Sequence, residues 1–289
     1  MQTAAGIVVL ASLYALLGVG YVLVYRASRV LNLAQGDLMM VGGYALWAAA
    51  TTVSVPPAAA GLAIAASFAI GVLVYVLLMR PMAAHPIFAA VLVTVSVGIL
   101  LRVSVVLLYS DQVRYPAQAM AFSNRPVALP GGAAISLIDL FTVLAACVVM
   151  TGLFAFLRVS LVGIRMRAAG ERPLLAAQRG INFQLLFALS WGLASLTCGI
   201  AGALFASNVR LDPSVGVLGL KAFAVALVGG LDSLGGVVPA ALLVAAVEVL
   251  TIRYGNPLLA DVSPFLCLLG MLLVRPWGFA GTREELERV

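Results

Sequence analysis

Long, nearly unbroken apolar runs alternate with short polar turns along the chain, and this pattern predicts membrane-spanning helices. A helix needs about 20 mainly apolar residues to cross the hydrocarbon core of a bilayer, and single strands cannot satisfy their backbone groups there. We therefore expect each apolar run to be a helical span. The expected spans cover residues 4–25, 36–54, 58–79, 87–109, 136–157, 184–207 and 258–274.

One further apolar segment, residues 217–252, is interrupted by the glycine-rich stretch "GGLDSLGG". Its first half is short for a crossing, so its two halves either both cross or together form a re-entrant hairpin, and the sequence leaves both open. Interrupted helices occur at membrane depth only where they are buried in protein or line a water-filled path. The glycines are therefore candidates for the translocation pathway: Gly229, Gly230, Gly235 and Gly236.

These runs together predict an all-α polytopic membrane protein with roughly eight transmembrane helices in a single domain, residues 1–289. Composition supports this, because 63% of the residues are hydrophobic and only 10% are charged, against about 25% charged in soluble domains. A soluble globular protein is excluded. The first run is long enough to span and has neither a preceding basic segment nor a small-residue cleavage site, so we expect a span rather than a cleaved signal peptide.

The formal net charge of +6 comes almost wholly from arginines in short loops. Such loops are typical of the cytoplasmic side of membrane proteins, and they give no indication of nucleic-acid binding. The distribution predicts an external N-terminus, an external loop over residues 110–135, a cytoplasmic loop over residues 158–183 and a cytoplasmic C-terminus. The arginines that would lie inside are Arg26, Arg29, Arg80, Arg158, Arg165, Arg167, Arg172, Arg179 and Arg275.

Polar residues stand at the start of the second span, in "RVLNLAQGDLMMVGGYALWAA". Unsatisfied polar groups cost several kcal/mol in hydrocarbon. Asn32 is predicted to cap a helix that begins near Ala34 by accepting the amide of Gln35, and Asp37 in the first turn would favour the helix dipole. These residues could also line a solute pathway, and this role is compatible with helix capping. The pathway candidates in this stretch are Asn32, Gln35, Gly36 and Asp37.

Three charged residues lie within apolar runs and need an explanation. Arg102 must face the bundle interior and find a carboxylate or carbonyls; Glu248 is a possible partner, with Asp139 and Asp37 as alternatives, and a structural ion pair is expected. Lys221, the only lysine, is predicted to snorkel to the membrane interface. The alternative for Lys221 is attraction of a solute carboxylate, which makes it another pathway candidate.

Motifs of catalysis and cofactor binding are missing from the sequence. A P-loop requires Gly-Lys followed by Ser or Thr, but Lys221 follows Leu220. The single histidine, His85, cannot form a paired-histidine metal site, and the three cysteines lie in apolar runs without metal-ligand spacing. We therefore expect no catalytic, metal or cofactor site in this chain.

The longest cytoplasmic connection contains a short helix-like apolar face between Gly170 and Gly180. Such a helix could lie on the lipid surface or dock into a groove of a partner protein. Arg167 and Glu171 have the spacing of a local helical ion pair. Asn182 is predicted to cap the following span.

Several stretches resemble the permease subunits of branched-chain amino acid ABC importers, of the first of the two related permease types. "RMRAAGERPLLAAQRGIN" resembles the cytoplasmic coupling loop of that family, "LNLAQGDLMMVGGY" its first polar motif, "KAFAVALVGGLDSLGGVVPAALLVAAVE" its late glycine-rich motif and "LLVRPWGFAG" its closing segment. These matches occur in the family order and extend over nearly the whole chain.

The resemblance implies a non-catalytic subunit of an inner-membrane importer for branched-chain or similar small amino acids. Its partners would be a second related permease in a heterodimer, two ATPase subunits that hold ATP and Mg, and an external solute-binding protein. The coupling-loop residues implied to contact the ATPase are Arg167, Gly170, Glu171, Ala176 and Gly180.

Two departures from the family pattern change this expectation in detail. Leu33 and Gln35 stand where Phe and His are common, and glutamine cannot titrate, so proton handling by this motif is disfavoured. Glu171 stands alone where an acidic pair is frequent. Related permeases that carry urea or short amides give an alternative function, and an ion-coupled secondary transporter is a second alternative that the coupling-type loop disfavours.

Overall fold

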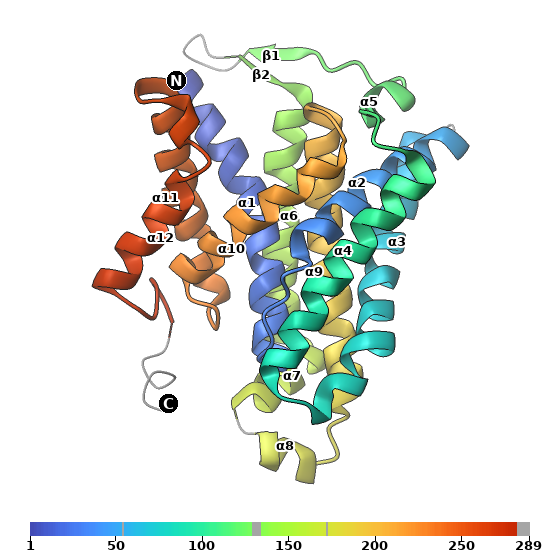
Figure 1. Cartoon of the computed structure of the whole chain (residues 1–289), viewed down its shortest axis with the longest axis vertical. Helices are drawn as coiled ribbons and strands as arrows, with labels where there is room; N and C mark the ends of the chain where they lie inside the picture. The colour runs from blue at the N-terminus through green and yellow to red at the C-terminus, as the bar shows by residue number, and fades with distance from the viewer. Residues whose placement is uncertain (54, 129–133, 172, 282–289) are drawn as a thin grey trace.

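The computed structural model describes residues 1–53, 55–128, 134–171 and 173–281, and within these residues the fold is almost entirely helical (Figure 1). Six of the described helices are long and apolar enough to cross a membrane, which shows a polytopic membrane protein. They overlap the ranges expected from the sequence, and most extend beyond them by one to three residues at an end. They are α1 (Gln2–Ser28), α3 (Pro56–Val74) with its π-helical end η1 (Tyr75–Met79), α4 (Ile87–Tyr109), α6 (Leu137–Val159), α9 (Phe183–Asn208) and α11 (Leu234–Tyr254).

Three other apolar helices are shorter or more polar than these six: α2 (Gln35–Thr52), α10 (Val217–Gly229) and α12 (Ser263–Val274). Helix α12 begins later than the expected span, because the 3-10 turn η4 (Pro257–Leu259) and the following turn occupy the start of residues 258–274. Short elements complete the described chain: η2 (Pro81–Ala84), α5 (Pro116–Ala119), β1 (Pro126–Ala128), β2 (Ala134–Ser136), α7 (Leu161–Glu171), α8 (Pro173–Gln178) and η3 (Pro213–Gly216).

Helices α1 and α9 form the centre of the bundle. Every residue from Leu13 to Val24 of α1 is buried. Helix α1 packs against α6, α9, α10 and α11, whereas α9 also packs against α2 and α3. A helix that is apolar on all sides and enclosed by other helices is expected to be buried in this way.

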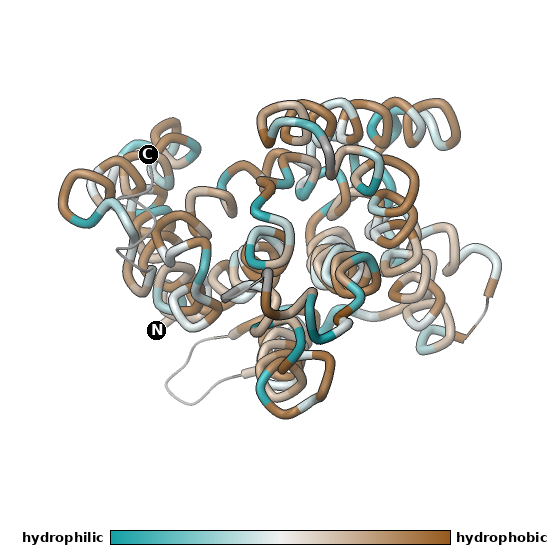
Figure 2. Tube along the Cα trace, turned by 90° about the horizontal axis from the view of Figure 1, so that it is seen from below, coloured by the Kyte–Doolittle hydropathy of each residue, from teal (hydrophilic) through white to brown (hydrophobic). Residues whose placement is uncertain are grey.

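The outer helices α4 and α6 expose many large apolar side chains, including Ile99, Leu107 and Val148. Figure 2 shows apolar residues on the outward sides of helices as well as between them. In water such a surface would be unfavourable, so these faces fit a lipid or protein environment within the membrane.

The two ends of the bundle differ (Figure 1). One end carries α5 and the antiparallel pair β1 and β2, with Val127 opposite Ile135; this is the loop expected outside, and the strand pair was not predicted. The opposite end carries α7 and α8, which form the loop expected in the cytoplasm. We call these the hairpin end and the coupling end.

The interrupted segment 217–252 forms two antiparallel halves, α10 and α11, which pack on each other. Helix α10 has 13 residues and is therefore about 20 Å long, which is short of the ~30 Å hydrocarbon core. The segment before α10 extends to the hairpin end, because Leu211 pairs there with Arg114 of the loop. Of the two halves, α11 alone is long and apolar enough to cross a membrane, so the choice between two crossings and a re-entrant hairpin stays a prediction.

Candidate functional site

Two helices, α2 and α10, begin near the middle of the bundle, and their first turns touch (Figure 1). A Cβ atom added to Gly36 would lie 2.0 Å from the carbonyl oxygen of Gly216, and one added to Gly219 would lie 2.3 Å from the Cα of Gly36. These distances are below any real contact, so only glycine permits this approach of backbones. We call the contact of Gly36 with Gly216 and Gly219 the half-helix junction.

The loops that lead into the two half-helices have the same local design. Asn32 Oδ1 accepts a hydrogen bond from the amide of Ala34 at 3.1 Å, and Asp212 Oδ1 accepts one from the amide of Ser214 at 2.8 Å. Both are Asx turns, in which a short polar side chain bonds to the backbone two residues on. The turns satisfy backbone donors at the point where the chain is not helical.

Asn32 does not cap α2 in the predicted way. The helix begins at Gln35 with Ala34 as its N-terminal cap, and no side chain bonds there. Asn32 lies too early for capping, and its side-chain amide instead donates to Gln35 Oε1 at 2.7 Å. The prediction that Asn32 accepts a hydrogen bond from the amide of Gln35 is wrong, because the amide that Asn32 accepts from is that of Ala34.

Gln35 is fully buried against α1 and α9. Its Nε2 donates to the Sγ of Cys198 at 2.8 Å, and a Cβ added to Gly20 would lie 1.9 Å from the same nitrogen. The side chain is therefore enclosed by packed helices, where it ties α2 to α9.

Asp37 and Arg102 form an ion pair beside the junction. The Nε and Nη2 atoms of Arg102 lie 3.0 and 2.8 Å from Asp37 Oδ1. The Asp37 side chain is 11% exposed, but the Arg102 side chain, which reaches it from α4, is 49% exposed. Arg102 thus has a carboxylate partner, as predicted, and of the three candidates, Glu248, Asp139 and Asp37, it is Asp37.

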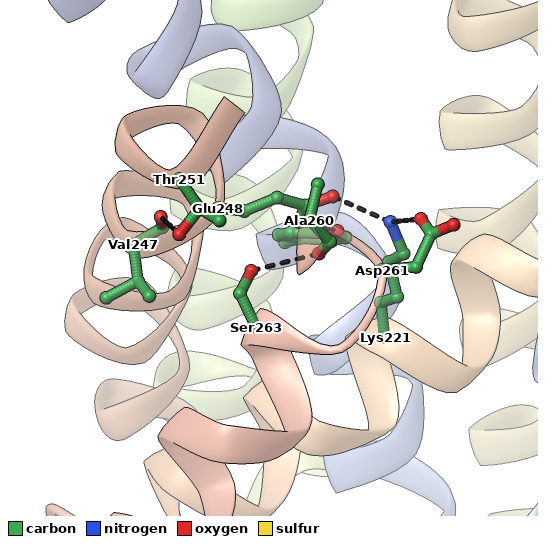
Figure 3. A network of polar contacts seen from close by, with 8 residues as sticks. Lys221, Val247, Glu248, Thr251, Ala260, Asp261 and Ser263 are labelled. Atoms are coloured by element: carbon green, nitrogen blue, oxygen red, sulfur yellow. Dashed lines mark hydrogen bonds and ion pairs between the residues drawn. The ribbon is translucent and has the colours of Figure 1, made fainter. Parts of the chain in front are cut away.

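Glu248 belongs to a second charged cluster, which links α1, α10, α11 and the loop before α12 (Figure 3). Lys221 Nζ lies 2.6 Å from Glu248 Oε1 and 2.8 Å from Asp261 Oδ1. Tyr14 donates to Glu248 Oε2 at 2.5 Å. Lys221 is buried, so the prediction that it snorkels to the interface is wrong: two carboxylates, one of them buried, replace water as its partners.

Asp261 is the exposed member of this cluster, since its side chain is 86% exposed. The hydrogen bond from Lys221 and the charge of that ammonium group lower the pKa of Asp261 below its ordinary value. We call Tyr14, Lys221, Glu248 and Asp261 the lysine cluster.

The glycines of the "GGLDSLGG" stretch form the tight turn between α10 and α11. A Cβ added to Gly236 would lie 2.0 Å from the carbonyl oxygen of Gly229, so the backbones are in direct contact. Gly230 adopts φ +97°, and the amides of Phe279 and Ala280 bond to carbonyls at the end of α10. This turn is one helix length, about 20 Å, away from the half-helix junction, and the junction does not include these glycines.

The comparisons with known proteins agree on one family. The family described as the branched-chain amino acid transport system permease component matches residues 3–274. The chain belongs to this permease family. No solved structure matches it significantly.

Curated relatives match the permease over almost its full length. The high-affinity branched-chain amino acid transport system permease protein LivH of Salmonella typhimurium is 29% identical, over 98% of this chain and 95% of the relative. BraD of Pseudomonas aeruginosa, with the same description, is 28% identical over 96% of this chain and 94% of the relative. A probable LivH of Methanocaldococcus jannaschii is 27% identical over 98% and 94%.

The loop that resembles the family's coupling loop contains two short helices, α7 and α8. Ala176 is buried, Gly170 lies close to the carbonyl oxygen of Arg26, and Gly180, in the turn after α8, adopts φ +71°. Arg167 donates to the carbonyls of Leu157 and Arg158. The side chain of Glu171 lies outside the described residues, so its predicted pairing with Arg167 stays a prediction.

Asn182 caps α9 as predicted, because its Oδ1 accepts the amide of Leu185 at 3.2 Å. Among the described residues, no three histidine, cysteine, aspartate or glutamate side chains gather into a metal site.

One signal in the sequence was missed. Leu31-Asn32 with Gly36 and Leu211-Asp212 with Gly216 repeat the same spacing, and these are the segments that form the two Asx turns and meet at the junction. A search for Leu, Asn or Asp, three residues and Gly would have found Asp212 and Gly216. No local signal marks Tyr14 or Asp261, because their roles depend on partners far along the chain.

Proposed function

We propose that this chain is the transmembrane subunit that moves a branched-chain or similar small amino acid through the bacterial inner membrane, and that the solute passes beside Arg102 of α4, next to the half-helix junction. The observation that carries the location is the half-exposed side chain of Arg102. The family supports the transport of branched-chain amino acids, which the relatives' descriptions name.

The position of Arg102 indicates that the surface of α4 around it faces another protein or water rather than lipid. A charged group at the centre of a bilayer is costly, by about 2.5–3.5 kcal/mol on insertion scales and more in simulations, so such residues face protein or water. Here Arg102 lies on α4 among exposed apolar side chains, with Ile99 and Val103 as neighbours. A second permease that covers this face would enclose a passage with Arg102 in its wall.

The chemistry of Arg102 suits a carboxylate. Asp37 Oδ1 accepts hydrogen bonds from Nε and Nη2 of Arg102. Among the described residues, Nη1 of Arg102 has no hydrogen-bond partner. A guanidinium held on one side and open on the other can donate to the α-carboxylate of an amino acid. Urea and short amides carry no such charge.

The partners and orientation follow from the family and the arginine pattern. We propose a heterodimer with a second related permease, two ATPase subunits that bind ATP, and an external binding protein that delivers the solute. The coupling end faces the cytoplasm, because most of the loop arginines belong to it, and α7 and α8 contact the ATPase through the region of Gly170, Ala176 and Gly180. The hairpin end faces outward.

Uptake by the purified complex in liposomes tests this proposal. Arg102→Gln removes a charge-assisted hydrogen bond, which is worth about 1.5–3 kcal/mol, so uptake of leucine at low concentration should fall about 10- to 100-fold while Arg102→Lys retains part of it. Val106→Ala, at an exposed position one helical turn from Arg102, serves as the control.

The purified yield of intact complex must be equal for all variants, because loss of the Asp37 pair could also weaken assembly. Uptake of leucine and of a neutral short amide is compared in each variant. Loss of leucine uptake alone supports the proposal, whereas unchanged leucine uptake, or equal loss for both solutes, contradicts the role of Arg102 as a carboxylate contact.

A further inference from the structure

A cavity of about 340 Å³ lies at the coupling end, away from the half-helix junction. Its walls come from the ends of α1 and α6, from α7, from the start of α9 and from the turn between α10 and α11. The volume falls within the ~300–1,000 Å³ of small-molecule pockets. Neither the coupling motif nor the ion pairs described above assign it a role.

The cavity is strongly basic. Arg26, Arg158 and Arg167 line it from three different helices, and Asp232 supplies one carboxylate. Among the described lining residues, three positive charges and one negative charge leave a net charge of +2. Arg167 is held in place by its bonds to the carbonyls of Leu157 and Arg158, while within the described residues the Arg158 side chain forms no ion pair or hydrogen bond. Such a convergence of guanidinium groups favours an anion, and phosphate above all.

The remaining wall is apolar. Phe154 and Leu186 line the cavity beside the arginines, and Phe154 is 51% exposed on α6. A free inorganic anion would make no use of this wall. A molecule with a phosphate head and a hydrocarbon tail would use both parts, since its head would meet the arginines and its tail would follow the apolar face of α6.

We propose that this cavity binds the headgroup of an anionic phospholipid from the leaflet at the coupling end. Basic pockets between helices on the cytoplasmic side are suited to such headgroups. Because Arg167 belongs to α7, the bound lipid would join the first helix of the coupling loop to the ends of α1 and α6. The lipid would thereby hold α7 in its place beneath the bundle, whatever solute the permease carries.

Thermal stability of the purified complex in nanodiscs tests the proposal. The wild-type complex should unfold at a higher temperature in phosphatidylglycerol than in phosphatidylcholine, and native mass spectrometry should show retained phosphatidylglycerol. Arg158→Gln should reduce both effects, and Arg158→Glu should abolish them. Arg165→Gln is the matched control, because Arg165 belongs to the same loop but does not line the cavity.

Three outcomes would overturn the proposal. The first is an equal phosphatidylglycerol effect in the Arg158 variants and the Arg165 control. The second is an equal stabilisation by inorganic phosphate in phosphatidylcholine, which would make this a small-anion site. The third is a crosslink from Arg158→Cys to an ATPase subunit in the native membrane, which would make the cavity part of a protein interface.

Discussion

Lys221 shows how a charge is accommodated at the residue scale in this bundle. It is buried between Glu248 and the exposed Asp261, and Tyr14 satisfies the second oxygen of Glu248. A buried pair of this kind adds little net stability, but removal of one partner leaves an uncompensated charge. The cluster therefore sets the position of α10 against α1 and α11 more than it stabilises the fold.

Glu248→Gln should destabilise the purified complex strongly, by about 3–5 kcal/mol, because Lys221 then keeps only its exposed partner. The double variant Lys221→Met with Glu248→Gln should recover much of this loss. Thermal unfolding in detergent gives the measurement. A double variant as unstable as the sum of the single variants would show that the two charges do not act as a pair.

Asp261 gives the cluster a weak dependence on pH. Its pKa is lowered in the folded protein by Lys221, relative to about 3.9 for an unperturbed aspartate. The folded state is therefore favoured above the ordinary value, and this contribution is lost as the pH falls through the lowered pKa. Since Asp261 is exposed, the contribution is at most about 1 kcal/mol.

Asp261→Asn should consequently lower the unfolding temperature slightly at pH 7, and the difference from wild type should begin to shrink below about pH 4 and vanish below the lowered pKa. Asp111→Asn, an exposed carboxylate at the hairpin end with no ion pair within the described chain, serves as the control. A difference that grows on acidification would contradict the assignment of the lowered pKa to Asp261.

At the scale of elements, the half-helix junction depends on the absence of side chains. The first turns of α2 and α10 meet at Gly36, Gly216 and Gly219, and neither Gly36 nor Gly219 has room for a methyl group. Both helices begin at mid-depth only because the preceding loops satisfy their own backbone groups through Asn32 and Asp212. The junction is thus built by glycine and by two Asx turns.

Gly36→Ala should force α2 and α10 apart and cost about 1–3 kcal/mol or more. Gly61→Ala on α3 is the matched control, because no atom lies within 4 Å of its added Cβ and alanine favours a helix over glycine. Purified yield and unfolding temperature give the readout. Tolerance of both alanines without loss would show that the helices separate freely at this point.

The helices could be predicted from the sequence, whereas most of their contacts could not. Hydropathy and length located the spans because every backbone group in lipid must be satisfied within its own helix. The partner of Arg102 was not fixed by these rules, since Asp37 and Glu248 both lie in apolar runs and only packing distinguishes them. Helix α2 shows a further limit: it is enclosed by protein, and so tolerates Gln35 and Asp37 at its start.

At the scale of the whole molecule, the hairpin end and the coupling end have distinct surfaces. The two candidate sites lie in different parts of the bundle. The half-helix junction lies near the middle of the bundle, and the basic cavity lies at the coupling end. This arrangement suits a transport subunit whose solute path and energy-coupling contact are different surfaces. The proposed orientation across the membrane can be measured directly.

Cysteine labelling of intact cells tests the orientation in a variant with Cys147 and Cys267 replaced by alanine. A membrane-impermeant maleimide should label Gln112→Cys at the hairpin end without permeabilisation, and Gln178→Cys in α8 only after it. Both positions are exposed. The reverse labelling pattern would invert the proposed orientation and move the coupling helices to the outside.

The half-exposed Arg102 also has a consequence for the biogenesis of the transporter. A newly inserted subunit without its partners presents part of a guanidinium group to lipid, and this is unfavourable until another protein covers α4. Unassembled chains should therefore be less stable in the membrane than assembled ones, and quality-control proteases should remove them first. The same arginine that we assign to the solute path would thus help to keep the subunits of the transporter in balanced amounts.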